Sequence, residues 1–409
     1  MIFGNSQSGK FPLVVLIAIA GLTAGCGGGS SHVDNSSTTV PASSGSNVQP
    51  ITVGAGPAGN YANGVFTIVT VCVPSSSTCQ TVDNVLVDTG SYGLRLLSSA
   101  GGGAFTLTLP AQNAASGNPI GECAAFVSGF TWGPVKSADI SMAGEHASKI
   151  PVQVIDPSFS AVPSACSNTG VPEDDTIHTL GANGILGVGP YVADCGLACE
   201  QAGTANPGLY YECVGASCHV IPQTTSLQVQ NPVAFFAKDN NGVVIELPAI
   251  TSSLNSLTGS MIFGIGTQSN NALGSAALFP LDSSGEFSTS YKGHSYPAFV
   301  DSGSNALFFL DTSQTGLTVC SDNSGFYCPA SQADMSAKTI SGGSSATINF
   351  SVISADKLFA AQSNFVFPNL AGPNAGTFDW GLPFFFGRNV FTAIESRSTP
   401  AGTGPFWAY

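Results

Sequence analysis

Two similar segments decide the fold, VLVDTGSYGLRLL at residues 85–97 and AFVDSGSNALFFL at residues 298–310. They align without gaps, and six of their 13 positions are identical, including the aspartate, the glycine and the serine of a D-[TS]-G-S sequence. The aspartates, Asp88 and Asp301, lie 213 positions apart, which is the length of one lobe. The sequence therefore predicts a duplicated fold with one aspartate in each half.

Each aspartate follows an apolar strand and precedes a glycine, which permits a tight turn and lets backbone N–H groups approach the carboxylate. Hydroxyl groups one and three positions after the aspartate can bind the carboxylates or connect the two loops. If the loops meet across a pseudo-dyad, both carboxyls cannot ionise together, so one keeps a proton. Such a pair offers a general base and a general acid to one water molecule.

The composition excludes several classes of protein. Of 409 residues, 24 are acidic and 10 are basic, and the formal net charge is −14. The charged share of 8% argues against coiled coils and charge-rich disorder, while 43% apolar residues allow a large core in two domains or lobes. An acidic chain disfavours a polyanionic ligand, so we expect no nucleic-acid partner.

Most of the body has the periodicity of strands, and long helical patterns are almost absent. The strongest candidates for short helices are residues 232–238 and the stretch near residues 355–361. No repeat of 20 to 50 residues recurs, which argues against propellers and solenoids. The clearest predicted strands are residues 65–71, 84–87, 150–155, 243–247 and 347–352.

The N-terminus is predicted to be an export signal over residues 1–25, whose apolar stretch, residues 11–22, is too short to span a bilayer comfortably. The signal ends in LTAGC, which resembles a bacterial lipobox although Thr23 replaces the usual large aliphatic residue. This resemblance implies cleavage and lipidation at Cys26, which would anchor the protein to a membrane. The alternative is an ordinary signal peptide with an incidental cysteine.

Residues 26–50 are rich in Gly, Ser and Thr and are predicted to form a flexible tether after the lipidated cysteine. No later apolar run reaches the roughly 18 residues that a membrane span needs. We therefore expect a lipid-anchored protein of the cell envelope that faces the periplasm or the cell exterior.

Eleven cysteines less the lipidated one leave ten, an even number that suits disulfides in an oxidising compartment. Short spacing suggests two pairs, Cys72 with Cys79 and Cys320 with Cys328, and a longer loop suggests a third, Cys123 with Cys166. The remaining four allow three pairings, and their spacing before a histidine could instead hold zinc; export favours disulfides, so we expect no metal. These four are Cys195, Cys199, Cys213 and Cys218.

The two complete aspartate motifs, each after an apolar strand, resemble those of the pepsin-like aspartic peptidases. The resemblance covers roughly residues 51–409 and implies a mainly β, bilobal, double-barrel fold with an active-site cleft between the lobes. Four shorter segments are similar to the strands leaving the flap, the segment beneath the first loop, a strand near the lobe junction and the segment beneath the second loop. They are residues 132–142, 184–189, 259–264 and 380–387.

The resemblance implies an N-terminal lobe over residues 51–235, with a cysteine-rich insertion near 190–230, and a C-terminal lobe over residues 236–409. Because a lipobox is foreign to the best-known members, the chain looks like a bacterial lipoprotein branch of the superfamily. A monomer acting on a peptide or protein, without a cofactor, is expected.

The resemblance also assigns roles at the site. Asp88 and Asp301 would activate the water, and their motif neighbours would support them. Among these neighbours, Thr89 and Ser302 would hold the loops together, while Ser91 and Ser304 would hydrogen-bond the carboxylates. The supporting residues are Thr89, Gly90, Ser91, Ser302, Gly303 and Ser304.

The sequence departs from the family at the flap, which normally presents a tyrosine over the cleft. The aromatic residues in the region 126–130 are both phenylalanines, so Phe126 and Phe130 are the candidate flap contacts. This departure, together with the cysteine-rich insertion, favours an alternative function, a surface lipoprotein that keeps the pepsin-like shell to bind peptides or proteins without cleaving them.

Overall fold

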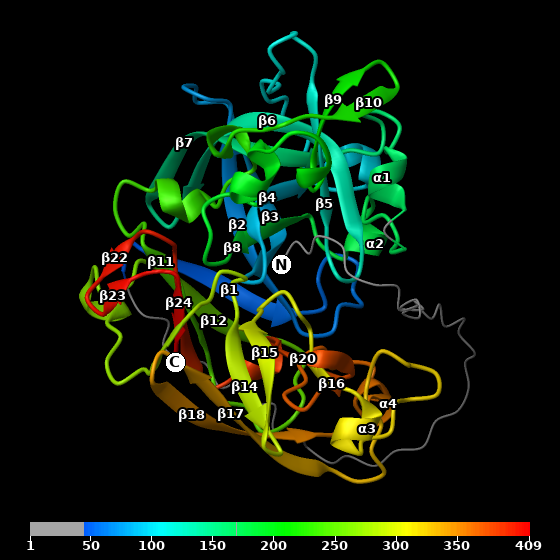
Figure 1. The fold of residues 1–409 in the computed structure, drawn as a ribbon, viewed down its shortest axis with the longest axis vertical. Helices are drawn as coiled ribbons and strands as arrows, with labels where there is room; N and C mark the ends of the chain where they lie inside the picture. Colours follow the sequence, from blue (N-terminus) through cyan, green and yellow to red (C-terminus); the bar gives the residue numbers. More distant parts are fainter. Residues whose placement is uncertain (1–44, 169) are drawn as a thin grey trace, which may run out of the picture.

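The computed structural model describes residues 45–168 and 170–409. The predicted signal peptide, the candidate lipidation site Cys26 and most of the predicted tether lie outside the described residues. The chain forms two β-rich lobes, the first drawn above the second in Figure 1. This confirms the predicted mainly β, bilobal fold.

The N-terminal lobe contains a closed barrel. Hydrogen-bonded pairing passes around six strands and returns to the first, because β6 pairs with both β7 and β2. In order around the barrel, the strands are β2 (Gly64–Cys72), β3 (Cys79–Asp88), β8 (Gly184–Val188), β4 (Tyr92–Leu97), β7 (Glu145–Ile155) and β6 (Phe130–Met142).

A hairpin projects from this barrel and carries the cysteine-rich insertion beside it. The strand β5 (Ile120–Ala125) pairs with β6, and β9 (Tyr210–Val214) pairs with the free edge of β5. The insertion ends this small sheet with β10 (Ser217–Val220). The insertion therefore adds two strands, β9 and β10, to the β5 edge of the hairpin.

The C-terminal lobe is a half-barrel of seven strands. In sheet order, they are β18 (Ser344–Val352), β17 (Ala333–Ser341), β14 (Phe287–Tyr291), β15 (His294–Val300), β20 (Asn374–Trp380), β16 (Leu307–Leu310) and β19 (Ala371–Gly372).

A further run of strands joins the lobes. The strand β1 (Val48–Gly54) pairs with β2 of the first barrel and with β12 (Leu257–Phe263), so the strand expected near the lobe junction lies there. Since β1 begins at Val48, residues 48–50 belong to this sheet and not to the predicted tether. Beyond β12, the run continues with β11 (Gly242–Leu247), β21 (Arg388–Ala393), β24 (Phe406–Ala408) and β13 (Leu278–Pro280).

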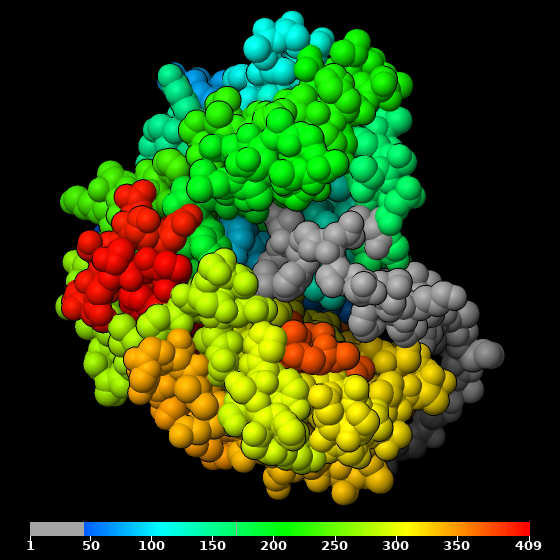
Figure 2. All heavy atoms as spheres, in the orientation of Figure 1, coloured from blue at the N-terminus to red at the C-terminus, as the bar shows by residue number. Residues whose placement is uncertain are grey.

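The C-terminal residues, red in Figure 2, lie at the junction between the two lobes. They include the short hairpin of β22 (Ser398–Thr399) and β23 (Gly402–Thr403).

Helices are few and short, as the sequence predicts. The α-helices are α1 (Ser164–Ser167), α2 (Ile177–Leu180), α3 (Thr312–Thr315) and α4 (Ala355–Phe359). The helix expected within residues 232–238 is a 3-10 helix, Pro232–Phe235. No helix among the described residues is long and apolar enough to cross a membrane.

Ten cysteines form five disulfides, and the three pairs suggested by spacing are confirmed. The structure also resolves the open pairing, joining Cys195 to Cys199 and Cys213 to Cys218. The sulfur atoms of these four residues are bonded to each other, so they do not form the alternative zinc site.

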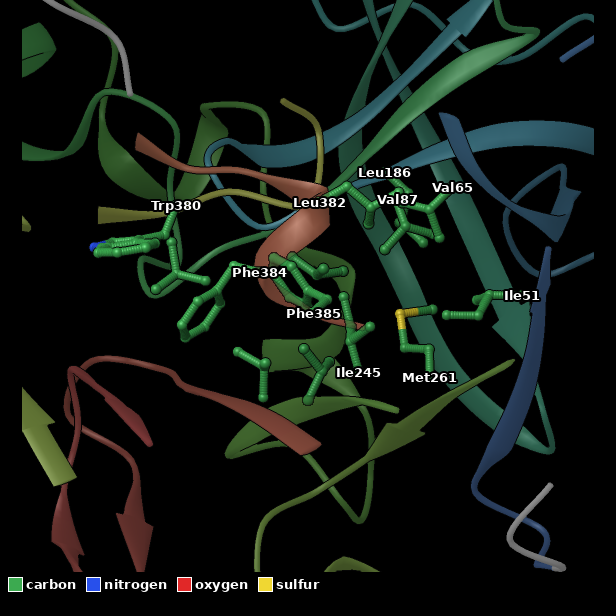
Figure 3. Packing of buried hydrophobic residues seen from close by; sticks show 14 of the residues in the cluster. Ile51, Val65, Val87, Leu186, Ile245, Met261, Trp380, Leu382, Phe384 and Phe385 are labelled. Atoms are coloured by element: carbon green, nitrogen blue, oxygen red, sulfur yellow. The ribbon is translucent and has the colours of Figure 1, made fainter. Parts of the chain in front are cut away.

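One continuous hydrophobic core runs through both lobes. Figure 3 shows Val87 and Leu186 from the first lobe, Trp380 and Leu382 from the second, and Met261 from the joining strands. These side chains are almost fully excluded from solvent. Apolar burial of this extent holds rigid the strands that end at the two aspartates.

The crossing of β8 beneath the first aspartate loop gives a stability prediction. A Cβ atom at Gly187 would lie 2.5 Å from the backbone nitrogen of Tyr92, a contact that backbone movement must relieve. We expect Gly187→Ala to lower the free energy of unfolding by about 1–3 kcal/mol, the usual cost of overpacking. Urea unfolding measures this change.

Gly325→Ala is the matched control, because a Cβ there meets no atom within 4 Å. Its unfolding midpoint should stay close to that of the parent. Equal destabilisation by both substitutions would contradict this account of the crossing.

Candidate active site

The two aspartates occupy equivalent places in the two lobes. Asp88 ends β3, and the chain returns along β4, while β8 lies between them, parallel to β3 and antiparallel to β4. Asp301 follows β15, and the chain returns along β16, with β20 between them in the same orientations. The segments predicted to pass beneath the two loops therefore do so, and the duplication seen in the sequence extends to the topology.

The loops meet face to face, and each glycine faces the carboxyl of the other loop. A Cβ atom built on Gly90 would lie 2.6 Å from the carboxyl carbon of Asp301, and one on Gly303 would lie 2.7 Å from that of Asp88. No side chain fits in either place. Glycine therefore lets each loop approach the carboxyl opposite it.

Two side-chain hydroxyls connect the loops through four hydrogen bonds. Thr89 Oγ1 donates to the carbonyl of Val300 at 3.1 Å and accepts from the Ser302 backbone N–H at 2.9 Å. Ser302 Oγ donates to the carbonyl of Val87 at 2.8 Å and accepts from the Thr89 N–H at 3.1 Å. Both residues are fully buried, so these bonds hold the two lobes in register.

The carboxylates are held by their own loops. The Gly90 N–H donates to Asp88 Oδ1 at 2.8 Å, and Ser91 Oγ donates to Asp88 Oδ2. In the second loop, the Gly303 N–H lies 2.7 Å from Asp301 Oδ1, and Ser304 Oγ lies 3.0 Å from Asp301 Oδ2. The structure thus brings together all eight residues of the two predicted motifs.

The electrostatics of the pair are those of two carboxyls sharing one site. Burial, followed by the neighbouring Asp88 carboxylate, raises the pKa of Asp301 to about 7. Because like charges this close cannot both be stabilised, the pair holds one proton below neutral pH. A singly protonated pair can take one proton from a water molecule and donate another to a substrate.

The β5–β6 hairpin stands where the sequence predicts a flap, and its connecting residues, 126–129, include no tyrosine. Phe126 is partly buried against the core cluster that includes Phe66, and the Arg95 guanidinium carbon lies 5.7 Å from its ring centre. Phe130 is only 3% exposed and packs in a core cluster with Trp132. Phe130 is thus a core residue, whereas the flap contact of Phe126 stays a prediction.

Comparisons with known proteins give a family match and, separately, a similarity of fold. Residues 43–409 match the family described as "Protein of unknown function (DUF3443)". The chain belongs to this family. No curated protein matches it.

Among solved structures, the fold of this DUF3443 member is similar to that of the aspartic proteinase from Irpex lacteus. The TM-score is 0.52 at 18% sequence identity, and the alignment covers 88% of this chain and 96% of that one. At this identity the likeness shows a shared pepsin-like fold.

Sequence reasoning on the DUF3443 chain missed Tyr61, which lies beside the site. Burial raises its pKa, and the carboxylates of Asp88, Asp174 and Asp301 raise it further. Its ring stands edge-on to Phe66 at 5.7 Å. Only the folded chain brings Tyr61 close to both aspartates, because it precedes β2 and belongs to no motif.

A third carboxyl, Asp379 at the end of β20, was also missed. Its Oδ2 atom lies 2.6 Å from Ser304 Oγ, which in turn lies 3.0 Å from Asp301 Oδ2. The sequence did contain a signal: Asp379 is an acidic residue within the apolar segment TFDWGLPFFF.

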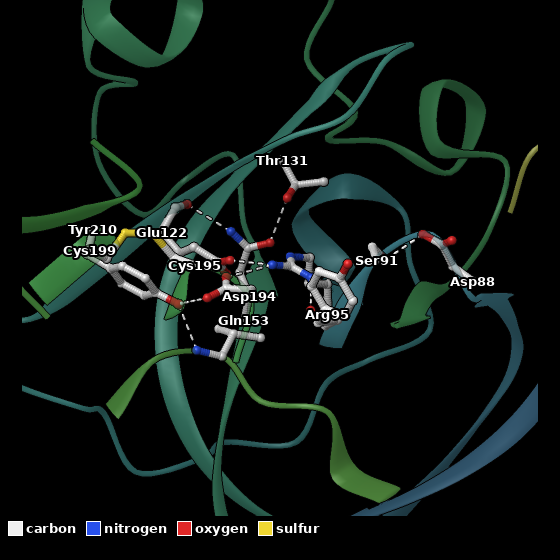
Figure 4. Close-up of polar contacts among 12 residues, drawn as sticks. Asp88, Ser91, Arg95, Glu122, Thr131, Gln153, Asp194, Cys195, Cys199 and Tyr210 are labelled. Carbon is white, nitrogen blue, oxygen red and sulfur yellow. Dashed lines mark hydrogen bonds and ion pairs between the residues drawn. A yellow bond between two sulfur atoms is a disulfide. The ribbon is translucent and has the colours of Figure 1, made fainter. Parts of the chain in front are cut away.

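A buried polar network surrounds Arg95 of β4, the strand that follows the first loop (Figure 4). The Arg95 side chain from β4 forms ion pairs with Glu122 of β5 and, at 2.9 Å, with Asp194 of the insertion. The Tyr210 hydroxyl donates to Asp194 at 2.6 Å. This network fastens the insertion and the hairpin strand β5 to the strand that leaves Asp88.

Groups that could hold a metal are not found at the two aspartates. The one candidate group among the described residues combines Asp356 with Cys320 and Cys328. Both sulfur atoms belong to a disulfide, so they cannot act as thiolate ligands.

The cross-loop hydrogen bonds lead to a prediction. Thr89→Val keeps the shape of the side chain but leaves the buried Ser302 N–H without its acceptor. We expect a loss of about 1–3 kcal/mol in the free energy of unfolding, the cost of an unsatisfied buried donor. Denaturant unfolding measures it, with Thr70→Val, whose hydroxyl bond is exposed, as the control. A stable Thr89→Val variant would contradict the role given to these bonds.

Proposed function

We propose that this protein is an aspartic endopeptidase that hydrolyses peptide bonds with a water molecule activated by Asp88 and Asp301. The observation that carries the proposal is the symmetric approach of the two loops, in which each glycine faces the carboxyl of the other loop. The similarity to an aspartic proteinase fold supports it.

In the proposed reaction, the ionised carboxyl of the pair takes a proton from the water as its oxygen attacks the carbonyl carbon of the substrate. The protonated carboxyl donates its proton to the carbonyl oxygen, giving a neutral tetrahedral intermediate. The C–N bond then breaks as the pair gives one proton to the amine nitrogen and takes one from a hydroxyl of the intermediate. The amine leaves, the new carboxyl group retains the oxygen of the water, and the pair regains its single proton. Ser91 and Ser304 keep the two carboxyls oriented.

A second candidate is a peptide-binding lipoprotein without turnover. One observation favours it: the connection of the β5–β6 hairpin has no tyrosine to position a substrate or water. The presence of both aspartates with all their hydrogen-bond partners favours the peptidase.

Location in the cell envelope is part of the proposal. Five disulfides suit an oxidising compartment outside the cytoplasm. The LTAGC sequence would supply a lipid anchor at Cys26 and hold a monomer at the bilayer, where it meets peptides or proteins.

Peptide cleavage distinguishes the two candidates. The protein lacking residues 1–25 should cleave members of a mixed peptide library at mildly acidic pH, as mass spectrometry can detect. We expect Asp88→Asn and Asp301→Asn each to reduce cleavage by at least about 1,000-fold, because either change removes half of the acid–base pair.

The control is Asp322→Asn, which changes an exposed aspartate outside both motifs and should cleave as the parent does. Cleavage that survives either active-site substitution would contradict the mechanism. Peptide binding without cleavage by the parent would favour the binding protein.

The pKa of Asp301 gives the expected pH dependence. Because that pKa is raised to about 7, the pair loses its last proton as the pH rises through neutrality. Activity should therefore be present at mildly acidic pH and fall about tenfold per pH unit above about pH 7. An initial-rate profile from pH 4 to 9 measures this, and a flat profile would contradict a shared proton.

A further inference from the structure

Asp379 occupies a place where the duplicated fold has an apolar residue. Val87 of β3 pairs with Leu186 of β8, and in the second lobe Val300 of β15 pairs with Trp380 of β20. Asp379, the residue before Trp380, therefore stands where the first lobe has Ile185. The two halves match at the aspartate loops and differ here, so the acidic side chain is a feature of the second loop alone.

The hydrogen-bond geometry around Ser304 requires an additional proton. Ser304 Oγ lies 2.6 Å from Asp379 Oδ2 and 3.0 Å from Asp301 Oδ2, yet a hydroxyl group has only one hydrogen. If both carboxyls were ionised, one of these contacts would join two acceptors without a hydrogen between them. One of the two carboxyls must therefore donate to Ser304.

The surroundings of Asp379 identify it as the proton carrier. The residue is 6% exposed, and its Oδ1 atom is buried with no hydrogen-bond partner in the described part of the chain. Asp301, in contrast, accepts backbone N–H bonds at its Oδ1 atom, which stabilise the ionised form.

No positively charged side chain among the described residues forms an ion pair with Asp379. Its strand neighbours in the sheet register are the apolar residues Phe299 and Phe308. Among the described residues, the charged groups that act on it are the carboxyls of Asp301 and Asp88. Burial, followed by Asp301, raises the pKa of Asp379 well above its ordinary value.

We propose that Asp379 is a positioning residue of the candidate catalytic pair: a carboxylic acid that keeps its proton at neutral pH and donates it to Ser304 Oγ. The Ser304 hydrogen then points to Asp301 Oδ2. The inference deepens the proposed function and rests on it for the role in catalysis, whereas the protonation of Asp379 rests on the hydrogen-bond geometry alone.

This arrangement makes the site one of three carboxyls and two protons at mildly acidic pH. One proton is shared by Asp88 and Asp301 and leaves near pH 7, while the other stays on Asp379. The fixed donor from Ser304 favours the ionised form of Asp301. It thereby makes Asp301 different from Asp88, because the serine partner of Asp88, Ser91, has no carboxyl group at the position equivalent to Asp379.

Infrared spectroscopy tests the protonation without any need for activity. At pH 9, after Asp301 has ionised, the spectrum of the parent should retain the carbonyl band of a buried protonated carboxyl, shifted in D₂O. The band assigned to Asp379 should be absent from Asp379→Asn. Asp379→Ile, which copies the first lobe, should also lack it and serves if the asparagine variant does not fold.

Two controls make the assignment specific, and both should leave the band assigned to Asp379 in place. Asp322→Asn changes an exposed carboxyl, and Asp194→Asn changes a different buried carboxyl whose pKa is also raised. A difference spectrum between the parent and Asp379→Asn that contains no protonated carboxyl at pH 9 would overturn the proposal, whether or not the protein cleaves peptides.

The rate profile tests the positioning role. Asp379→Asn keeps a neutral donor to Ser304, so the alkaline limit of activity should stay within about 0.3 pH units of the parent. Asp379→Ile removes the donor, which weakens the bond to ionised Asp301 and should shift that limit upward by up to about half a unit.

If Asp379 were ionised instead, Asp379→Asn would remove a negative charge and lower the alkaline limit by about one unit or more. That result would overturn the inference while leaving the peptidase intact. If the parent cleaved no peptide, the proposed function would be overturned, and the infrared result would still decide whether Asp379 is protonated.

Discussion

The architecture depends on the mutual hydrogen bonding of Thr89 and Ser302. Each hydroxyl donates to a carbonyl in the opposite lobe and accepts an N–H from it, so neither loop can move without leaving buried groups unsatisfied. The bonds fix the separation of the two carboxyls. A catalytic pair tolerates little error in that separation, because one water molecule must reach both groups.

The remaining structure supports this contact from both sides. Beneath each loop, the backbone of another segment crosses so closely that only glycine fits, at Gly187 of β8 and at Gly381 just after β20, and the shared core keeps both crossings in place. Beside the first loop, the buried Arg95 network fastens the insertion to strand β5 of the β5–β6 hairpin. Behind the second loop, Asp379 takes up the position of an apolar residue and completes a chain of hydrogen bonds.

Much of the site could be predicted because its residues are close in sequence to the aspartates. The motif residues, the strands before them and the disulfides with short loops all follow from local spacing. Tyr61 and Asp379 could not be found in this way, since their roles arise from long-range packing. Long-range packing also decides the role of Phe130. Its place near the expected flap suggested a cleft contact, but the side chain packs in a core cluster with Trp132 and residues of the insertion.

In the proposed mechanism, Asp88 and Asp301 form one site around a single water molecule. A neutron crystal structure at mildly acidic pH tests it most directly, because it locates hydrogen atoms as well as oxygen. We expect one water within about 2.6–3.2 Å of both carboxyls, with one proton between the pair. Two carboxyls that each bind separate water molecules, or that are both ionised, would contradict it.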